Sequence, residues 1–265
     1  MLNLITTAAA GGHSGGSGLM PAAACVVQEG DSPYGLIPAL CEGGAVAQLT
    51  FLVMLIMFIG TLYILFTKLL EQNKVMKQGR DVANNFWRAP TLAEGATKLE
   101  KNSAYRQVVE DGLRANDEHI KLTDTLEAHD WMHGTLERSQ NHINSKLNGG
   151  LSFLATVGST APFIGLFGTV IGILRALVKI GASGQASIDT VAGPVGEALI
   201  MTAIGLLVAV PAVLAYNWLQ ARNKVIARDL STFANDVLGS IMSNGQVKPA
   251  APAAKAAAKA APAKA

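Results

Sequence analysis

The sequence has little charge: 15% of its 265 residues are Asp, Glu, Lys or Arg, whereas 50% are hydrophobic. The formal net charge is only +2, which excludes the strongly basic surface that nucleic-acid binding needs. The chain also lacks a Walker phosphate loop, a dinucleotide-binding fingerprint and a nucleophile elbow. We therefore expect no enzyme activity, no cofactor and no nucleic-acid partner.

Residues 1–44 contain no Lys or Arg, although they carry three acidic residues. The chain has two cysteines, Cys25 and Cys41, and both lie in this segment. Because basic residues near a span stay in the cytoplasm, a segment without them is expected on the periplasmic side. That compartment permits a disulfide between the two cysteines, but two free thiols fit the sequence as well.

Three windows lack charge altogether, at 45–67, 151–174 and 198–221. As a helix, 24 residues reach about 36 Å, which is enough to cross a hydrocarbon core of about 30 Å. Buried core helices of a large soluble protein are the alternative, but three such windows are rare in so short a soluble chain. The sequence therefore predicts an all-α membrane protein with three transmembrane helices.

The basic residues set the predicted orientation. Lys68, Lys74, Lys77 and Arg80 directly follow the first window, within a segment 68–150 that has 12 basic and 12 acidic residues. This places 68–150 in the cytoplasm. Two basic residues at the outer end of the second span oppose the assignment weakly: Arg175 and Lys179. The predicted order is a periplasmic segment 1–44, transmembrane helix 45–67, cytoplasmic helical domain 68–150, transmembrane helix 151–178, periplasmic loop 179–193, transmembrane helix 194–218, cytoplasmic helix 219–245 and a disordered Ala/Pro/Lys tail 246–265. The lysines of this tail can contact anionic membrane lipids.

The segments between the windows read as helices. Thr91 and Glu94 follow a proline and form a capping-box signature for a helix start. A stripe at helical spacing leads into the second span: Leu122, Leu126, His129, His133, Leu136, Gln140, Ile143 and Leu147. A second stripe follows the third span: Ile226, Leu230, Phe233, Val237 and Ile241. We expect both spans to continue as single long helices into a cytoplasmic four-helix-like bundle.

The sequence HDWMH offers one possible metal site. His129 and His133 are four residues apart, as two ligands on one helix face would be. However, Asp130 stands where a zinc protease has Glu, and the only further candidate ligand is His142. We interpret the pair as polar members of the stripe and predict no metal site.

Two spans carry faces of small residues, which allow close helix approach in lipid. On the second span these residues are Ala161, Gly165, Gly168 and Gly172. On the third span they are Ala198, Thr202, Gly205, Ala209 and Ala212. The two faces can pack on each other or line a shared cavity. Pro162 and Pro211 are expected to bend these two spans.

Thr169, Thr202 and Glu197 are the candidate functional side chains. A membrane threonine commonly bonds a carbonyl of its own helix, and Glu197 is close enough to the outer interface to be simply solvated. No acidic, basic or histidine residue lies inside the three windows. If protons cross here, a partner helix must supply the titratable group.

The runs GSTAPFIGLFGTVIGI (158–173) and GPVGEALIMTAIGLLVAVPAVLAYN (193–217) strongly resemble the signature spans of the ExbB/TolQ family, relatives of the flagellar stator protein MotA. Thr160 and the long N-terminal extension favour its ExbB branch over TolQ. The resemblance implies a homo-oligomeric ring, a homopentamer, in the inner membrane of a Gram-negative bacterium. Its pore would hold the single-span helices of an ExbD-like partner, and TonB would join from the side.

The resemblance also implies roles for single residues. Thr169 matches the family threonine in GTV, and Thr202 matches the threonine five residues after the glutamate; both would guide protons near the partner's Asp. Glu197 matches the family glutamate near the outer entrance or a subunit contact. The implied function is to convert proton flow into motion that energises TonB for import of siderophores, haem or vitamin B12. A TolQ-like motor and a scaffold ring without its own proton path remain the alternatives.

Overall fold

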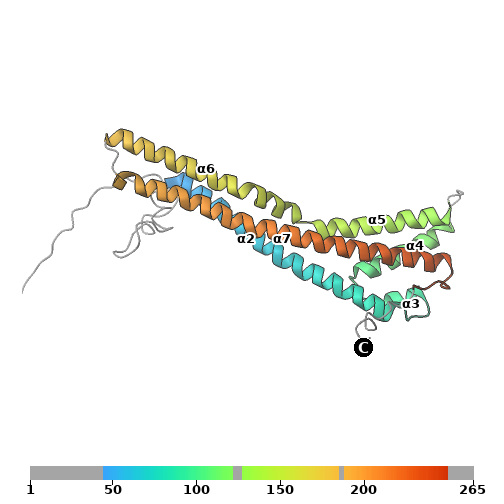
Figure 1. Ribbon diagram of the computed structural model, residues 1–265. Helices are drawn as coiled ribbons and strands as arrows, with labels where there is room; N and C mark the ends of the chain where they lie inside the picture. The colour runs from blue at the N-terminus through green and yellow to red at the C-terminus, as the bar shows by residue number, and fades with distance from the viewer. Residues whose placement is uncertain (1–43, 122–126, 185–187, 250–265) are drawn as a thin grey trace, which may run out of the picture. The chain divides into compact units, whose positions relative to one another are not determined.

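The computed structural model describes residues 44–121, 127–184 and 188–249, and all regular elements in those ranges are helical (Figure 1). The elements are α2 (Gly44–Asp81), the π-helical turn η2 (Val82–Phe86), α3 (Leu92–Thr97), α4 (Ala104–His119), α5 (Ala128–Asn148), α6 (Leu151–Ser183) and α7 (Ile188–Met242). The predicted all-α fold is confirmed for these residues.

Three of the helices are long and apolar enough to cross a membrane, and they contain the three uncharged windows. They are Gly44–Phe86, the α6 part of the stretch Ala128–Ala182, and Pro194–Met242. The helices α6 and α7 also extend into the segment 179–193 that was predicted as a loop. Three apolar helices of this length indicate a membrane protein.

The chain divides into two compact units. The described part of the first unit comprises the start of α2 to Thr61, the part of α6 from Ala155 and the part of α7 up to Val213. Within this unit α6 and α7 run side by side (Figure 1). Its core is made of small and flexible residues from all three helices: Ala47, Met54, Val157, Ala161, Met201, Val208, Ala209 and Ala212.

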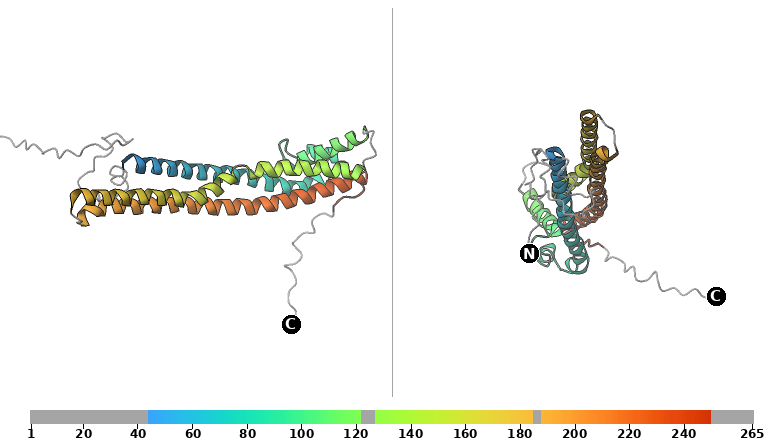
Figure 2. Two further views of the ribbon diagram at one scale, coloured as in Figure 1. Left: turned by 90° about the horizontal axis from the view of Figure 1, so that it is seen from above. Right: turned by 90° about the vertical axis from the view of Figure 1, so that its left-hand side faces the viewer.

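The second unit contains the rest of α2, η2, α3, α4, α5 and the last part of α7. The left-hand view of Figure 2 shows its helices from above. Gly112 of α4 lies where three helices meet, because a Cβ placed there would be 3.2 Å from Ile241 and 3.3 Å from Leu136. Phe86, Tyr105 and Phe233 add edge-to-face ring contacts at centroid distances of 5.2–5.3 Å.

The helix start that the sequence predicts at Thr91 is present, with one of the two bonds of a capping box, at the start of α3. Thr91 has an extended backbone, and its hydroxyl accepts a hydrogen bond from the Glu94 N–H at 3.3 Å. This bond satisfies one of the free N–H groups at the helix start.

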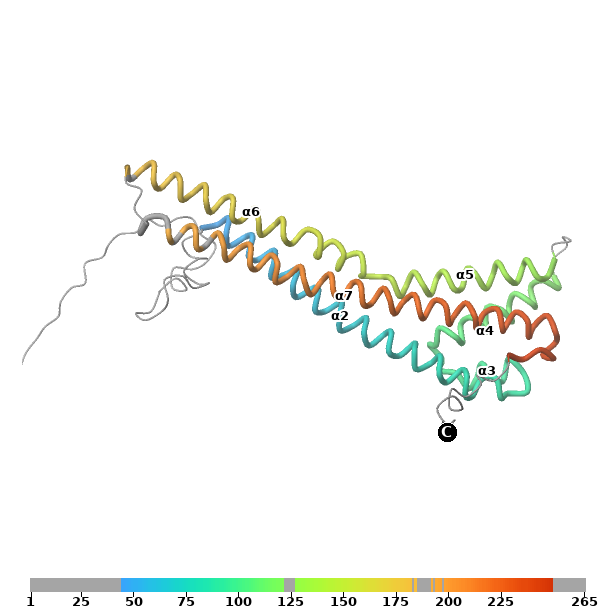
Figure 3. Tube along the Cα trace, in the orientation of Figure 1, coloured from blue at the N-terminus to red at the C-terminus, as the bar shows by residue number. Residues whose placement is uncertain are grey.

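Two details of the predicted helices are wrong. The chain breaks between α5 and α6 at Gly149 and Gly150, so the stripe and the second span are two helices rather than one (Figure 3). Gly150 has a φ of +84°, a left-handed conformation that ends a helix and that favours glycine. The predicted stripe is confirmed at Leu136, Ile143 and Leu147, which are buried, but His129 and His133 are exposed, and Met132 and Ser139 complete the buried face instead. Leu122 and Leu126 lie outside the described residues.

By contrast, α7 is one helix from Ile188 to Met242, so the third span continues unbroken, as predicted. Pro194 and Pro211 both lie inside it, as Pro162 lies inside α6. Each proline removes one N–H from the helix ladder, but in these helices the backbone continues past it. The bends predicted at Pro162 and Pro211 stay predictions.

Candidate functional site

In the first unit α6 and α7 pack closely through their small residues, and this contact is here called the small-residue seam. Its residues are Ala161, Gly165, Gly168 and Gly172 of α6 and Ala198, Gly205 and Ala209 of α7. A Cβ added to Gly165 would lie 2.8 Å from the Met201 carbonyl oxygen and 3.1 Å from the Gly205 Cα. A Cβ added to Gly205 would lie 2.9 Å from the Ala161 carbonyl oxygen. No larger side chain fits at either glycine without moving a backbone.

The α6–α7 contact continues in both directions from Gly165. Near the ends of the spans, a Cβ on Gly172 would lie 3.0 Å from the Ala198 Cβ, and one on Gly158 would lie 2.5 Å from Val213. On the side of α2, a Cβ on Gly168 would lie 3.6 Å from the methyl group of Thr50. The helix α2 therefore packs against the seam as a third element of the first unit.

Thr169 is next to the seam and only 8% exposed. Its hydroxyl donates to the Leu166 carbonyl of its own helix at 2.6 Å. Two buried threonines of α2 do the same: Thr50 donates to Val46 at 2.8 Å, and Thr61 donates to Met57 at 2.9 Å. Local bonds of this kind leave the oxygen lone pairs of a hydroxyl available as acceptors.

Thr202 lies across the seam from Gly165, with its Cα 3.3 Å from the position of a Cβ there. The structure thus brings Thr202 to the point where the backbones of α6 and α7 approach most closely. Glu197 belongs to α7, but its side chain lies outside the described residues. Cys25 and Cys41 also lie outside them, so their disulfide remains an expectation.

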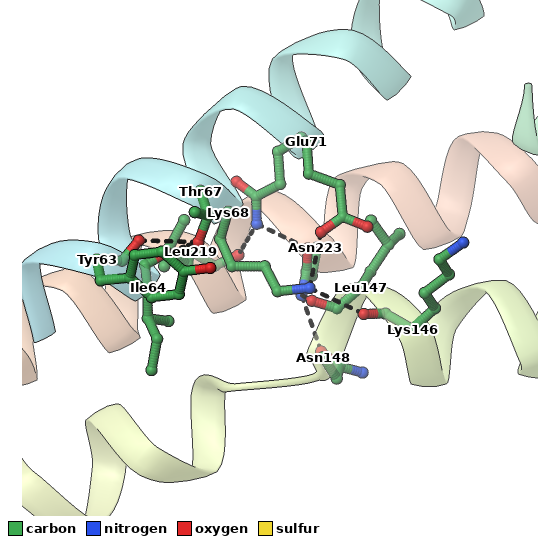
Figure 4. A network of polar contacts seen from close by, with 11 residues as sticks. Tyr63, Ile64, Thr67, Lys68, Glu71, Lys146, Leu147, Asn148, Leu219 and Asn223 are labelled. Atoms are coloured by element: carbon green, nitrogen blue, oxygen red, sulfur yellow. Dashed lines mark hydrogen bonds and ion pairs between the residues drawn. The ribbon is translucent and has the colours of Figure 1, made fainter. Parts of the chain in front are cut away.

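A polar cluster that no sequence pattern predicted lies in the second unit, where α5 ends and α6 begins (Figure 4). Asn223 of α7 donates to the Leu147 carbonyl at 3.2 Å and to the side chain of Asn148 at 2.9 Å. Gln72 of α2 donates to the Asn223 side-chain oxygen at 2.7 Å and to the Leu219 carbonyl at 2.9 Å. Gln72 is 0% exposed and Asn223 is 5% exposed, so these bonds are protected from water.

Lys68 contributes to the same cluster from α2. Its ammonium donates to the Lys146 carbonyl at 2.9 Å and pairs with Glu71 at 2.7 Å. The last carbonyls of a helix have no partner within it, and a positive charge there is favoured by the helix dipole. Lys68 and Asn223 thus cap the end of α5 from two other helices, which supports the break at Gly149–Gly150. No local pattern predicts partners more than 70 residues away.

Among the described residues, no group of three or more His, Cys, Asp or Glu side chains is placed to hold a metal ion. His142 lies on the exposed surface of α5, beyond His133. It does not complete a three-ligand site with the HDWMH pair.

The model of the MotA/TolQ/ExbB proton channel family matches residues 100–232, which is half of the chain. The chain belongs to this proton channel family. The matched range ends in α7 and includes α6 and the seam, so the contact between these two helices lies in the part that the family shares.

Relatives from two branches resemble the chain. The "Biopolymer transport protein ExbB" of Neisseria meningitidis serogroup A is 36% identical over 193 residues, covering 71% of this chain and 88% of the relative. ExbB of Xanthomonas campestris pv. campestris strain B100 is 42% identical over 166 residues. The match covers 59% of this chain and 66% of that relative, so the chain spans just under two thirds of the relative's length. The "Tol-Pal system protein TolQ" of Pseudomonas aeruginosa strain PAO1 is 50% identical over 91 residues, 34% of this chain and 39% of the relative. The expected membership of the ExbB/TolQ family is confirmed.

Proposed function

We propose that this chain is the ExbB-type subunit of an inner-membrane motor driven by protons. With an ExbD-like single-span partner, it uses the proton motive force to energise TonB for import of siderophores, haem or vitamin B12. The observation that carries the proposal is the α6–α7 pair, which combines a tight seam with the buried Thr169 hydroxyl. The three uncharged windows of the chain contain no carboxyl group, so in this proposal a partner supplies the group that carries the proton.

The apolar surface of the three helices supports an assembly in the membrane. Only 17%, 28% and 39% of the three apolar windows are buried within the chain. The remaining surface includes Phe163, Phe167 and Leu199, each more than half exposed, and needs lipid or other chains to cover it. A homopentamer whose second and third spans line a pore for the ExbD-like helices meets this need, with the N-terminus periplasmic and the C-terminus cytoplasmic.

In this proposal Thr169 acts through its acceptor lone pairs. Because its proton is directed to the Leu166 carbonyl, the oxygen can accept a hydrogen bond from a protonated carboxylic acid of the partner. When that acid loses its proton, the hydroxyl must rotate away from Leu166 to donate to the carboxylate. Thr202 would act in the same way, and Glu197 would stand near the outer entrance.

The test compares substitutions of Thr169 that differ only in the hydroxyl. Thr169→Val removes the hydroxyl and keeps the volume, so siderophore uptake should fall at least tenfold, whereas Thr169→Ser should retain most of it. Thr61→Val is the matched control, because Thr61 is as buried and makes the same kind of bond to its own helix. Assembly with the partner is checked by co-purification. Equal uptake in Thr169→Val and wild type would refute the role of the hydroxyl and favour a scaffold ring.

Complementation separates the TonB role from the TolQ-like alternative. The chain should restore siderophore uptake to a bacterial strain without its own ExbB and TolQ. Because the TolQ of Pseudomonas aeruginosa is 50% identical over part of the chain, resistance to detergent is measured in the same strain. Restored detergent resistance without restored uptake would assign the chain to envelope integrity instead.

A further inference from the structure

The two histidines of HDWMH lie one turn apart on the exposed face of α5. Their rings are nearly parallel, with an interplanar angle of 19° and 6.0 Å between the ring centres. The side chain of His129 is 57% exposed. Since Met132 and Leu136 occupy the buried face, neither histidine is needed for the core of the second unit. The sequence interprets the pair as polar members of the stripe, and the structure places both on the exposed side of α5, free of core packing.

Asp130 adds a second feature that metal sites share. Its Oδ1 atom is 3.2 Å from Nδ1 of His129. When Nδ1 carries the proton, it donates to this carboxylate, and Nε2 keeps its lone pair for a ligand. A carboxylate behind a coordinating imidazole fixes the ring orientation and makes the free nitrogen more basic.

We propose that His129 and His133 form a two-histidine chelate for a divalent transition-metal ion. With metal–nitrogen bonds of about 2.1 Å, one ion shared by two imidazoles holds the ring centres on the order of 5–6 Å apart. The observed 6.0 Å is near this distance, but the rings are nearly parallel, so both must rotate about their side-chain bonds to aim a nitrogen at a shared ion, which their exposure on the surface of α5 allows. Because the described residues offer no third ligand, water fills the other positions and the ion exchanges freely with solvent.

The chelate makes two physical predictions. Imidazole ligands follow the order Mn²⁺ < Ni²⁺ < Cu²⁺ > Zn²⁺, so Cu²⁺ should bind most tightly and Mg²⁺, which prefers oxygen ligands, should not bind. The ion also links residues four apart, so it should stabilise the first turns of α5. This proposal does not depend on the proton-channel function.

The experiment titrates the full chain, purified without a histidine tag in detergent micelles, with Cu²⁺, Ni²⁺, Zn²⁺ and Mg²⁺ by isothermal titration calorimetry. One Ni²⁺ per chain should bind. His129→Asn or His133→Asn should each weaken binding at least tenfold. His142→Asn is the matched control, since His142 is an exposed histidine of the same helix and should leave the affinity unchanged. Asp130→Asn should weaken binding by a smaller factor, because Asp130 positions a ligand rather than binding the ion.

Amide hydrogen exchange supplies a second readout. Ni²⁺ should slow exchange in residues 128–136 at least fivefold in the wild type and should have no effect in His133→Asn. Circular dichroism of each variant checks that the helices are retained. Equal affinity in the wild type and His133→Asn would overturn the proposal, as would an equal loss in His142→Asn, since both indicate scattered surface binding.

Discussion

Gly165→Ala tests the small-residue seam directly. The added methyl group would stand 2.8 Å from the Met201 carbonyl oxygen, whereas ordinary contact begins at 3.4 Å. The atoms it meets are backbone atoms of α7, which cannot rotate away as a flexible side chain can. Therefore α6 and α7 must separate by about 0.6 Å, and the other contacts of the seam must loosen with them.

Two opposing effects determine how much Gly165→Ala changes the free energy of unfolding. Overpacking of a well-packed contact costs about 1–3 kcal/mol. Alanine is also the better helix former, by about 1 kcal/mol relative to glycine. Gly181→Ala is the matched control, because Gly181 is in the same helix and a Cβ there meets nothing within 4 Å. The free-energy difference between the two variants isolates the steric cost.

The assay is thermal unfolding in detergent, followed by the circular dichroism of the helices. We expect Gly165→Ala to melt lower than Gly181→Ala by roughly 2–4 °C for each kcal/mol of steric cost. Gly205→Ala, on the opposite side of the contact, should behave as Gly165→Ala does. Equal melting temperatures for Gly165→Ala and Gly181→Ala would refute the tight α6–α7 contact.

Two further predictions concern the second unit. Asn223→Leu should lower the free energy of unfolding by about 1–3 kcal/mol, because it removes the donor to the Leu147 carbonyl and one of the two acceptors of the buried Gln72 amide, which keeps only the Leu219 carbonyl. The exposed Asn217 of the same helix provides the control, and an equal effect of Asn217→Leu on thermal unfolding would contradict the reasoning. Burial, with a smaller contribution from a nearby acidic side chain, raises the pKa of Tyr105 to about 12. The wild type should therefore lose stability as the pH rises from 10 to 12, and Tyr105→Phe should lose less over the same range in a melting series.

The sequence predicts the membrane helices well because their signal is local. Each uncharged window is long enough to form a span by itself, so composition and length suffice. The seam is also readable, since small residues at i, i+4, i+7 and i+11 must share one face of a helix. The start of α3 could be predicted for the same reason, because Thr91 and Glu94 are only three residues apart.

The break between α5 and α6 depends on contacts that are distant in sequence. Gly149 and Gly150 permit a break, but glycine pairs also occur inside helices. Lys68 of α2 and Asn223 of α7 favour the break, because they donate hydrogen bonds to the carbonyls at the end of α5 that the break leaves free. The histidines are a different kind of error. Both Met132 and His133 fit the helical spacing to Leu136, at i−4 and i−3, so spacing alone does not choose between them, and the apolar side chain is the one that is buried.

The geometry of the seam bears on which part of the proposed motor moves. A proton crossing 100 mV provides about 2.3 kcal/mol, which is comparable to the cost of about 1–3 kcal/mol for overpacking a tight contact. Because Gly165 and Gly205 bring two backbones together, sliding α6 along α7 would use most of the energy of each proton. The apolar side chains outside the seam, such as Phe167 and Leu206, offer a partner helix a surface without hydrogen bonds to break. We therefore expect α6 and α7 to stay together as one body while the partner helix turns against them.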